Sequence, residues 1–184
     1  MTIQTTARTP SGLETKFVTL DALERTGRDG RIKGYASLFG ELDQSGDVVE
    51  RGAFAASLRA LQGSGRRVKF LWQHDPATPI GVWTEVAEDA CGLRVAGQIL
   101  PSVARGADAI ALIAAGAIDG LSIGYRTIRA APNHETGGRT LSEIDLWEVS
   151  LVTFPMLPAA RASMRAADDA PSFEEALAAA LAGR

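Results

Sequence analysis

The sequence predicts a mainly β fold of the α+β class, a mostly antiparallel sheet or barrel with a few helices packed outside it. Short apolar segments alternate with polar residues and recur between turn residues over most of the chain. Helical periodicity is confined to a few stretches, without the regular strand–helix alternation of a parallel α/β fold. The 184 residues, 46% of them hydrophobic, are enough for one domain with its own core.

Most of the predicted strands lie in the first hundred residues, between clusters of glycine, aspartate and proline. In order they are KFVTL, IKGYASLFG, VVERGAF, RVKFLWQH, IGVWTEVAE and GLRVAGQIL. AFAASLRAL, at residues 53–61, predicts one short helix among them. Two later strands, LSIGYRTIR and TLSEIDLWEVSLVTF, are joined by the glycine-rich loop APNHETGGR.

A second helix is predicted over residues 103–115. Ser102 precedes it as a candidate N-cap, and Gly116 follows it as a stop signal. The face expected to be buried consists of Val103, Ala107, Ile110, Ala111 and Ala114.

The composition divides the chain into three regions. Residues 1–14 are polar and unpatterned, which predicts a flexible arm. Residues 15–158 contain the patterned segments and form the predicted domain. Residues 159–184 change to alanine, arginine and aspartate and are expected to form a C-terminal appendage, in which Ser172 and Glu175 have the spacing of a capping box for a short helix.

Bulk properties exclude several classes of protein. A net charge of −3 gives no electrostatic reason to expect nucleic acid as a partner. The first residues contain no apolar signal segment, and no apolar run reaches the length of a membrane span, so we expect a cytoplasmic protein that binds no membrane. Cys91 is the single cysteine, so no internal disulfide can form. It is expected to be a buried or half-buried thiol.

The sequence predicts no cofactor and no metal site. It contains no phosphate loop, zinc-ligand spacing or dinucleotide fingerprint. LDQSGD, at residues 42–47, carries Asp43 and Asp47 around a glycine and looks like part of a cation loop. The complete EF-hand spacing does not follow, so a tight turn is the better interpretation.

One candidate site is Ser122, in the segment GLSIG. Gly120 and Gly124 give it the G-x-S-x-G pattern of the nucleophile elbow of α/β-hydrolases. Strand alternation instead puts Ser122 and Gly124 on the face opposite Leu121 and Ile123, where glycine is typical of close approach by another backbone, such as a peptide substrate. The alternative interpretation is that Ser122 is an ordinary strand serine that makes one structural hydrogen bond.

The chain has two histidines, His74 and His134. His134 lies in a polar loop, where a solvated side chain is expected. His74 ends the apolar run VKFLWQ, so it could be held by packing and still reach a cleft, either as a structural residue or as a base. The elbow interpretation requires the order serine, acid, histidine, and His134 is the only histidine after Ser122, with no suitable acid before it. The elbow is therefore rejected.

Glu148 is a carboxylate flanked by apolar strand residues in DLWEVSLVTF. It is either an edge-strand charge that discourages aggregation or a buried acid with a partner. A serine nucleophile needs an imidazole to take its proton and a third group to orient that imidazole, roles that Ser122, His74 and Glu148 could fill. Asp145, expected on the other strand face, and Asp75, beside His74, compete for the third role.

Four separated segments resemble, in order, the HK97-type prohead (capsid maturation) proteases of tailed phages. They are GYASLFGELDQSGDVVERGAF, VKFLWQHDPATPIG, LIAAGAIDGLSIGY and DLWEVSLVTFPMLPAA. Small members of that family also occur in defective prophages and gene transfer agents. The resemblance implies a serine protease on a closed, mainly antiparallel β-barrel surrounded by helices, similar to the herpesvirus assemblins. It implies His74 and Ser122 as catalytic residues, with Glu148 on the strand that carries the third, where assemblins use a second histidine.

The resemblance also implies partners and a place of action. Family members cut capsid protein and scaffold segments inside the procapsid, in the host cytoplasm, and they also cut themselves. Residues 159–184 would then be a removable segment, and we expect a homo-oligomer, a dimer. The alternative is a non-catalytic capsid assembly or scaffolding module that retains the protease fold.

Overall fold

The structure, a computed structural model, describes residues 14–19, 24–26, 30–118 and 120–154. These residues form nine strands and two helices within the predicted domain of residues 15–158. Glu14 belongs to the first strand, whereas the rest of the predicted arm at residues 1–14 and the whole predicted appendage at residues 159–184 lie outside the described residues.

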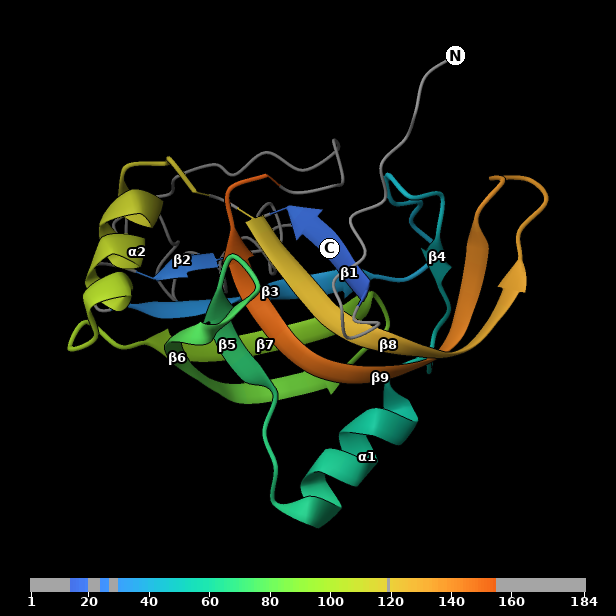
Figure 1. Ribbon diagram of the computed structural model, residues 1–184, viewed down its shortest axis with the longest axis horizontal. Helices are drawn as coiled ribbons and strands as arrows, with labels where there is room; N and C mark the ends of the chain where they lie inside the picture. The colour runs from blue at the N-terminus through green and yellow to red at the C-terminus, as the bar shows by residue number, and fades with distance from the viewer. Residues whose placement is uncertain (1–13, 20–23, 27–29, 119, 155–184) are drawn as a thin grey trace, which may run out of the picture.

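The strands pair into one mixed sheet in the order β1-β8-β9-β5-β6-β7-β3-β2, and β4 also pairs with β9 (Figure 1). Their bounds are β1 Glu14–Thr19, β2 Glu24–Thr26, β3 Arg31–Leu38, β4 Val48–Val49, β5 Lys69–Trp72, β6 Asp75–Glu88, β7 Gly92–Ile99, β8 Gly120–Pro132 and β9 Arg139–Val152. The prediction of a mainly β fold with few helices is confirmed.

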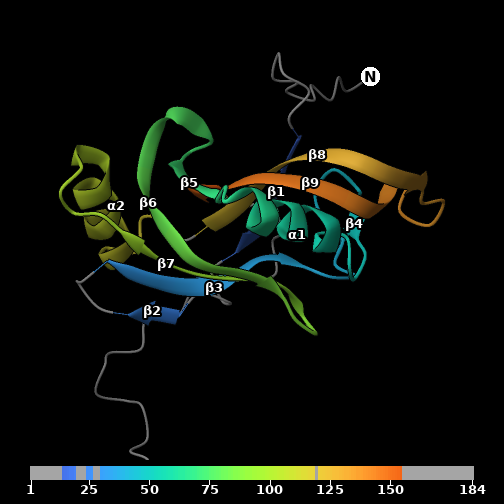
Figure 2. The same cartoon turned by 90° about the horizontal axis from the view of Figure 1, so that it is seen from below.

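The sheet is a curled half-barrel, so the predicted closed barrel is corrected. Figure 2 shows two leaves, with β8 and β9 in one, β3 and β7 in the other, and β6 curving between them. Among the described residues, no backbone pairing joins the two ends of the strand order, although β1 comes close to β3. The sheet is also not purely antiparallel, because β4 and β5 each pair with β9 in parallel.

The hydrophobic core lies between the two leaves of the sheet. Ile32 and Val95 contribute from one leaf, and Ile123 and Val149 from the other, all less than 5% exposed. Phe70 and Trp83 stack with ring centroids 4.0 Å apart. The Trp83 indole N–H also donates to the Val149 carbonyl at 3.2 Å, so β6 is tied to β9 by a side chain as well as through β5.

Helix α1, Ala55–Ser64, packs on β9 and β6, and helix α2, Ala104–Ala114, packs on β6 and β7. Helix α1 begins two residues later than predicted, because Ala53 and Phe54 belong to a turn that precedes it and Phe54 is its N-cap. Both residues are fully buried. No local side chain caps α1; instead the carboxylate of Glu88, on β6, accepts the Phe54 N–H at 2.9 Å.

Helix α2 ends before Gly116, which has a left-handed φ of 73°, as predicted. Two expectations for this helix were wrong. Its N-cap is Val103, without a side-chain cap from Ser102. Its buried residues are Gly106 and Ala109, while the predicted core positions Ala107, Ala111 and Ala114 are exposed.

Candidate active site

Ser122 lies on β8, between β1 on one side and β9 on the other. It is completely buried, and its register partners are Phe17 of β1 and Ser150 of β9. The two faces of this part of β8 do not differ in exposure, because every residue from Leu121 to Tyr125 is buried.

His74 lies in the two-residue turn between β5 and β6, next to the paired residues Trp72 and Asp75. Gln73 and His74 have φ values of 51° and 62°, the sign that a type I′ hairpin turn requires at both positions. Asparagine and glycine are the usual residues there, and a larger side chain costs on the order of 1–3 kcal/mol at each position. Strained positions of this kind persist only where the surroundings determine them.

The strained turn is fixed to the end of β9 through Gln73. The Gln73 backbone N–H donates to the Leu151 carbonyl at 2.9 Å. Its side-chain amide donates to the Thr153 hydroxyl at 2.6 Å, and its amide oxygen accepts the Thr153 N–H at 3.4 Å. These contacts orient the next residue, His74, toward the side chains of β9.

The His74 imidazole contacts the carboxylate of Glu148, with 2.5 Å between Nδ1 and Oε1. Glu148 is 3% exposed, and the His74 side chain is 18% exposed, so the pair is largely shielded from water. Ser150 completes the contact set: its hydroxyl donates to Glu148 Oε2 at 2.5 Å and accepts the His74 N–H at 3.1 Å. Of the two interpretations of Glu148, the structure therefore shows a buried acid with a partner.

Gly124 lies directly opposite Glu148 in the β8–β9 register. A Cβ atom at this position would be 2.0 Å from Oε1 and 2.7 Å from Cδ of Glu148. Close approach was expected at this glycine, and within the protein the group that approaches it is the Glu148 side chain. Only glycine leaves the carboxylate where it contacts His74.

The competing acids face elsewhere. Asp145 pairs with Arg126 at 3.2 Å and accepts the Trp147 indole N–H at 2.8 Å. Asp75 accepts the Thr78 hydroxyl at 2.5 Å and the Ala77 N–H at 2.9 Å, and these bonds lower the pKa of its carboxyl group. The β8–β9 pairing is irregular beside Tyr125, so Trp147 has no register partner between Leu146 and Glu148.

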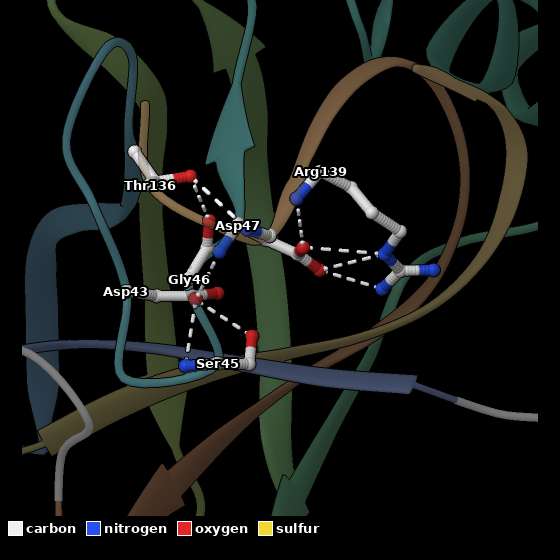
Figure 3. Close-up of polar contacts among 7 residues, drawn as sticks. Asp43, Ser45, Gly46, Asp47, Thr136 and Arg139 are labelled. Atoms are coloured by element: carbon white, nitrogen blue, oxygen red, sulfur yellow. Dashed lines mark hydrogen bonds and ion pairs between the residues drawn. The ribbon is translucent and has the colours of Figure 1, made fainter. Parts of the chain in front are cut away.

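The loop at residues 42–47 is a polar clamp, in which the carboxylates of Asp43 and Asp47 accept hydrogen bonds from protein donors (Figure 3). Asp43 accepts the N–H and hydroxyl of Ser45 and the N–H of Asp47 at 2.6–2.9 Å. The Asp47 carboxylate accepts hydrogen bonds from Arg139, the first residue of β9. The Arg139 guanidinium donates at 2.5 Å and the Arg139 backbone N–H at 2.8 Å. The Thr136 hydroxyl donates to the Gly46 carbonyl at 2.8 Å. The described residues contain no cluster of histidine, cysteine and acidic residues that could hold a metal.

The remaining candidates from the sequence lie outside this site. His134 is exposed in the turn between β8 and β9, as expected. Cys91 is exposed, so the expectation of a buried or half-buried thiol was wrong. It directly precedes β7, and its N–H donates to the Asp89 carboxylate at 2.7 Å.

A family model described as caudovirus prohead serine protease matches residues 18–172. The chain belongs to this family. The match includes all three candidate residues, His74, Ser122 and Glu148, and it agrees with the resemblance seen in the sequence.

Two phage prohead proteases are similar in sequence. That of Enterobacteria phage HK97 is 35% identical over 131 residues, which cover 70% of this chain and 57% of the relative. That of Escherichia phage T5 is 29% identical over 125 residues, which cover 68% of this chain and 58% of the relative. The chain thus spans little more than half the length of these relatives.

The bacteriophage T4 capsid assembly protease, gp21, is similar in structure, with a TM-score of 0.61 at 13% sequence identity. The likeness covers 78% of this chain and 98% of that chain. At this identity it supports the fold alone.

Sequence reasoning did not assign a role to Ser150 or Gln73. The signal for Ser150 was present, because strand alternation puts it on the same face as Glu148. No signal pointed to Gln73, because the expected turn residues of a type I′ hairpin are asparagine and glycine.

Proposed function

We propose that this chain is a serine endopeptidase that processes capsid and scaffold proteins during prohead maturation. In this proposal Ser122 is the nucleophile, His74 the general base and acid, and Glu148 the group that orients His74. Membership of the prohead serine protease family supports the reaction, and the names of the HK97 and T5 relatives support the process.

The observation that carries the proposal is the register between β8 and β9. Ser122 lies opposite Ser150, and Gly124 lies opposite Glu148, with regular pairing between them. Side chains of directly opposed residues project to the same face of a sheet. Ser122 therefore shares a face with Ser150 and Glu148, the two residues of β9 that hydrogen-bond to His74.

The proposed reaction is acyl transfer. Ser122 Oγ attacks the carbonyl carbon of the scissile peptide bond while His74 Nε2 takes the hydroxyl proton. The tetrahedral oxyanion collapses and the C–N bond breaks as Nε2 gives that proton to the leaving amine. The acyl group is now an ester of Ser122 Oγ. A water molecule, deprotonated by Nε2, attacks the ester carbonyl carbon, the bond to Oγ breaks, and Nε2 returns the proton to Oγ as the carboxylic acid product leaves.

Glu148 supports this cycle through its contact with Nδ1. A carboxylate oxygen at 2.5 Å accepts the Nδ1 proton of the neutral imidazole, which keeps the lone pair on Nε2. When Nε2 takes a second proton, the buried carboxylate stabilises the imidazolium that forms.

The proposed substrates are the major capsid protein, a scaffold segment and the protease itself. The proposed place of action is the assembling procapsid in the host cytoplasm, with the protease as a homo-oligomer. Among the described residues, no helix is both long enough and apolar enough to cross a membrane.

The test is co-expression with the capsid protein of the same particle. We expect wild type to shorten the capsid protein and Ser122→Ala to leave it at full length, with the new amino terminus read by mass spectrometry. Ser142→Ala is the matched control, because Ser142 lies on β9 and its hydroxyl contacts the Arg129 carbonyl, away from the site. Full-length capsid protein with both wild type and Ser122→Ala would contradict the proposal and favour the non-catalytic assembly module.

A further inference from the structure

Ser150 is a buried polar residue to which neither the sequence nor the family comparison assigns a role. It lies on β9 with no exposed surface, two residues after Glu148. Its hydroxyl accepts the His74 backbone N–H at 3.1 Å. It also donates at 2.5 Å to the carboxylate of Glu148, which in turn contacts the His74 imidazole.

The direction of each hydrogen bond follows from the atoms involved. The His74 backbone N–H can only donate, so the Ser150 oxygen accepts there. A hydroxyl carries one proton, and here it is directed to Glu148 Oε2. The carboxylate then accepts on both oxygens, from Ser150 at Oε2 and from His74 Nδ1 at Oε1.

These contacts close a ring of hydrogen bonds that starts and ends at His74. The ring runs from the His74 N–H to the Ser150 hydroxyl, on to the Glu148 carboxylate, and back to Nδ1 of the same imidazole. It fixes the backbone of His74, which has a left-handed φ of 62°, and the orientation of its side chain together. It also defines Nδ1 as the protonated nitrogen of the neutral ring.

We propose that Ser150 is a positioning residue for His74. Its hydroxyl holds the Glu148 carboxylate in one rotamer and the strained turn in one conformation, so that Nε2 keeps its lone pair and a fixed direction. This inference rests on the proposed function, in which Nε2 takes the proton of Ser122. In this proposal Ser150 acts through Glu148 and His74 and not on the substrate.

The first test is the kinetics of Ser150→Ala, which removes one oxygen atom and leaves the β-carbon in place. The substrate is a peptide that spans the cleavage site identified by co-expression. We expect kcat to fall about 10- to 100-fold, as for loss of one hydrogen bond to a charged group, with KM changed less than about twofold. Ser150→Thr, which keeps the hydroxyl, is expected to recover most of the lost kcat.

Ser142→Ala is the matched control for the kinetics, because it removes a hydroxyl from the same strand outside the ring. It should keep the wild-type kcat. Equal kcat values for Ser150→Ala, Ser142→Ala and wild type would overturn the inference. So would a low kcat in Ser150→Thr, provided that Ser150→Thr melts at the wild-type temperature.

The second test does not depend on activity. In a Ser122→Ala background, nitrogen-15 labelling of histidine reports only His74 and the exposed His134, since the chain has two histidines. We expect a far-downfield Nδ1 proton signal from His74 that exchanges slowly with water. Adding Ser150→Ala should speed its exchange about tenfold or more, while the His134 signals stay unchanged.

The two tests separate this inference from the proposed function. If Ser150→Ala alters the His74 signal but wild type leaves the capsid protein uncut, the ring stands and the proposed function fails. If wild type cuts the capsid protein and Ser122→Ala does not, yet Ser150→Ala leaves both kcat and the His74 signal unchanged, the function stands and the role of Ser150 fails.

Discussion

One buried carboxylate, Asp47, binds the first residue of β9, and another, Glu148, lies on β9 itself; their partners differ in kind. Asp47, 2% exposed, binds the Arg139 guanidinium and backbone N–H at one end of the strand. Glu148, 3% exposed, binds an imidazole and a hydroxyl near the other end. A guanidinium stays charged in proteins, whereas an imidazole gains and loses a proton near neutral pH.

Under the proposed function, this difference separates a carboxylate that serves the fold, Asp47, from one that serves the chemistry, Glu148. Asp47 is held by donors that never change protonation state, so its bonds join the loop at residues 42–47 to β9 permanently. Glu148 is held by His74 in a turn with strained φ values, which the fold maintains only at a cost. We therefore expect substitutions at the first site to change stability and at the second to change activity.

The largest effect is expected for Glu148→Gln. The amide is neutral and can donate to Nδ1, so it no longer stabilises an imidazolium or fixes the tautomer. We expect kcat to fall about 10³- to 10⁴-fold, as when the triad acid of a serine protease becomes an amide, with little change in melting temperature. The measurement is peptide cleavage at saturating substrate, beside thermal unfolding.

Asp145→Asn is the control for Glu148→Gln on the same strand. Asp145 is engaged by Arg126 and Trp147, so its loss should change kcat by less than about twofold. If Asp145→Asn abolished cleavage while Glu148→Gln did not, the orienting role would belong to Asp145.

Gly124→Ala should have the next largest effect on activity. The new Cβ would lie 2.0 Å from Glu148 Oε1, so the carboxylate must move away from its contact with His74. Displacing a catalytic group by about 1 Å can cost on the order of 100-fold in rate, and we expect a loss of that size in kcat. Overpacking is also expected to lower the free energy of unfolding by about 1–3 kcal/mol.

Gly63→Ala is the matched control for Gly124→Ala. Gly63 lies in α1, and a Cβ there meets nothing within 4 Å. It should raise the free energy of unfolding by about 0.5–1 kcal/mol, the usual helical preference for alanine, with full activity. Activity retained in Gly124→Ala would show that the carboxylate can move without loss of function.

Asp47→Asn tests the other side of the comparison. Without its charge, the side chain can no longer pair with Arg139, and we expect the free energy of unfolding to fall by about 2 kcal/mol. Cleavage at a temperature where the variant is folded should stay within about twofold of wild type. Urea unfolding measures the stability, and peptide cleavage measures the activity.

Asp108→Asn, at an exposed pair with Arg105, is the control and should lower the free energy of unfolding by less than about 0.5 kcal/mol. A large loss of activity in Asp47→Asn would mean that the clamp also shapes the site.

The sequence predicted the local features of the fold better than its closure. Strand alternation and turn residues identified the long hairpin of β8 and β9 and the stop of α2 at Gly116. Closure of the barrel came from the resemblance, and the described strands leave the sheet open. The parallel pairing of β5 with β9 was missed because periodicity gives the faces of a strand and not its neighbours.

The candidate site shows the same limit. The sequence selected His74, Ser122 and Glu148 by residue type and strand face, and the contact between His74 and Glu148 agrees with that choice. It could not reveal the turn that carries His74, because a left-handed pair of Gln73 and His74 contradicts local preference and depends on contacts with β9. Tertiary contacts overrule local preference at the point where the candidate site is built.

The smallest effect is expected at a third carboxylate, Asp89, which has a hydroxyl donor like that of Glu148 but lies at the surface. The Tyr35 hydroxyl donates to Asp89 at 2.6 Å; this bond, with some desolvation, raises the pKa of Tyr35 to about 12 and lowers the pKa of Asp89. Both shifts favour the folded state between the ordinary pKa values of aspartate and tyrosine, about 4 and 10. The contribution of Tyr35 is lost as the pH rises from about 10 toward 12, and that of Asp89 as the pH falls below about 4.

Tyr35→Phe should remove the alkaline part of this dependence and weaken the acid part. The measurement is urea unfolding at a series of pH values, with phenolate absorbance to follow the two tyrosines of the chain. Wild type should lose stability relative to Tyr35→Phe only above about pH 10, where unfolded tyrosine ionises before the folded residue does. A phenolate midpoint near 10 for Tyr35 would contradict the prediction. It would also mean that a hydrogen bond from a hydroxyl to a surface carboxylate is too weak to shift either pKa. The hydrogen bond from Ser150 to Glu148 would then owe its strength to burial.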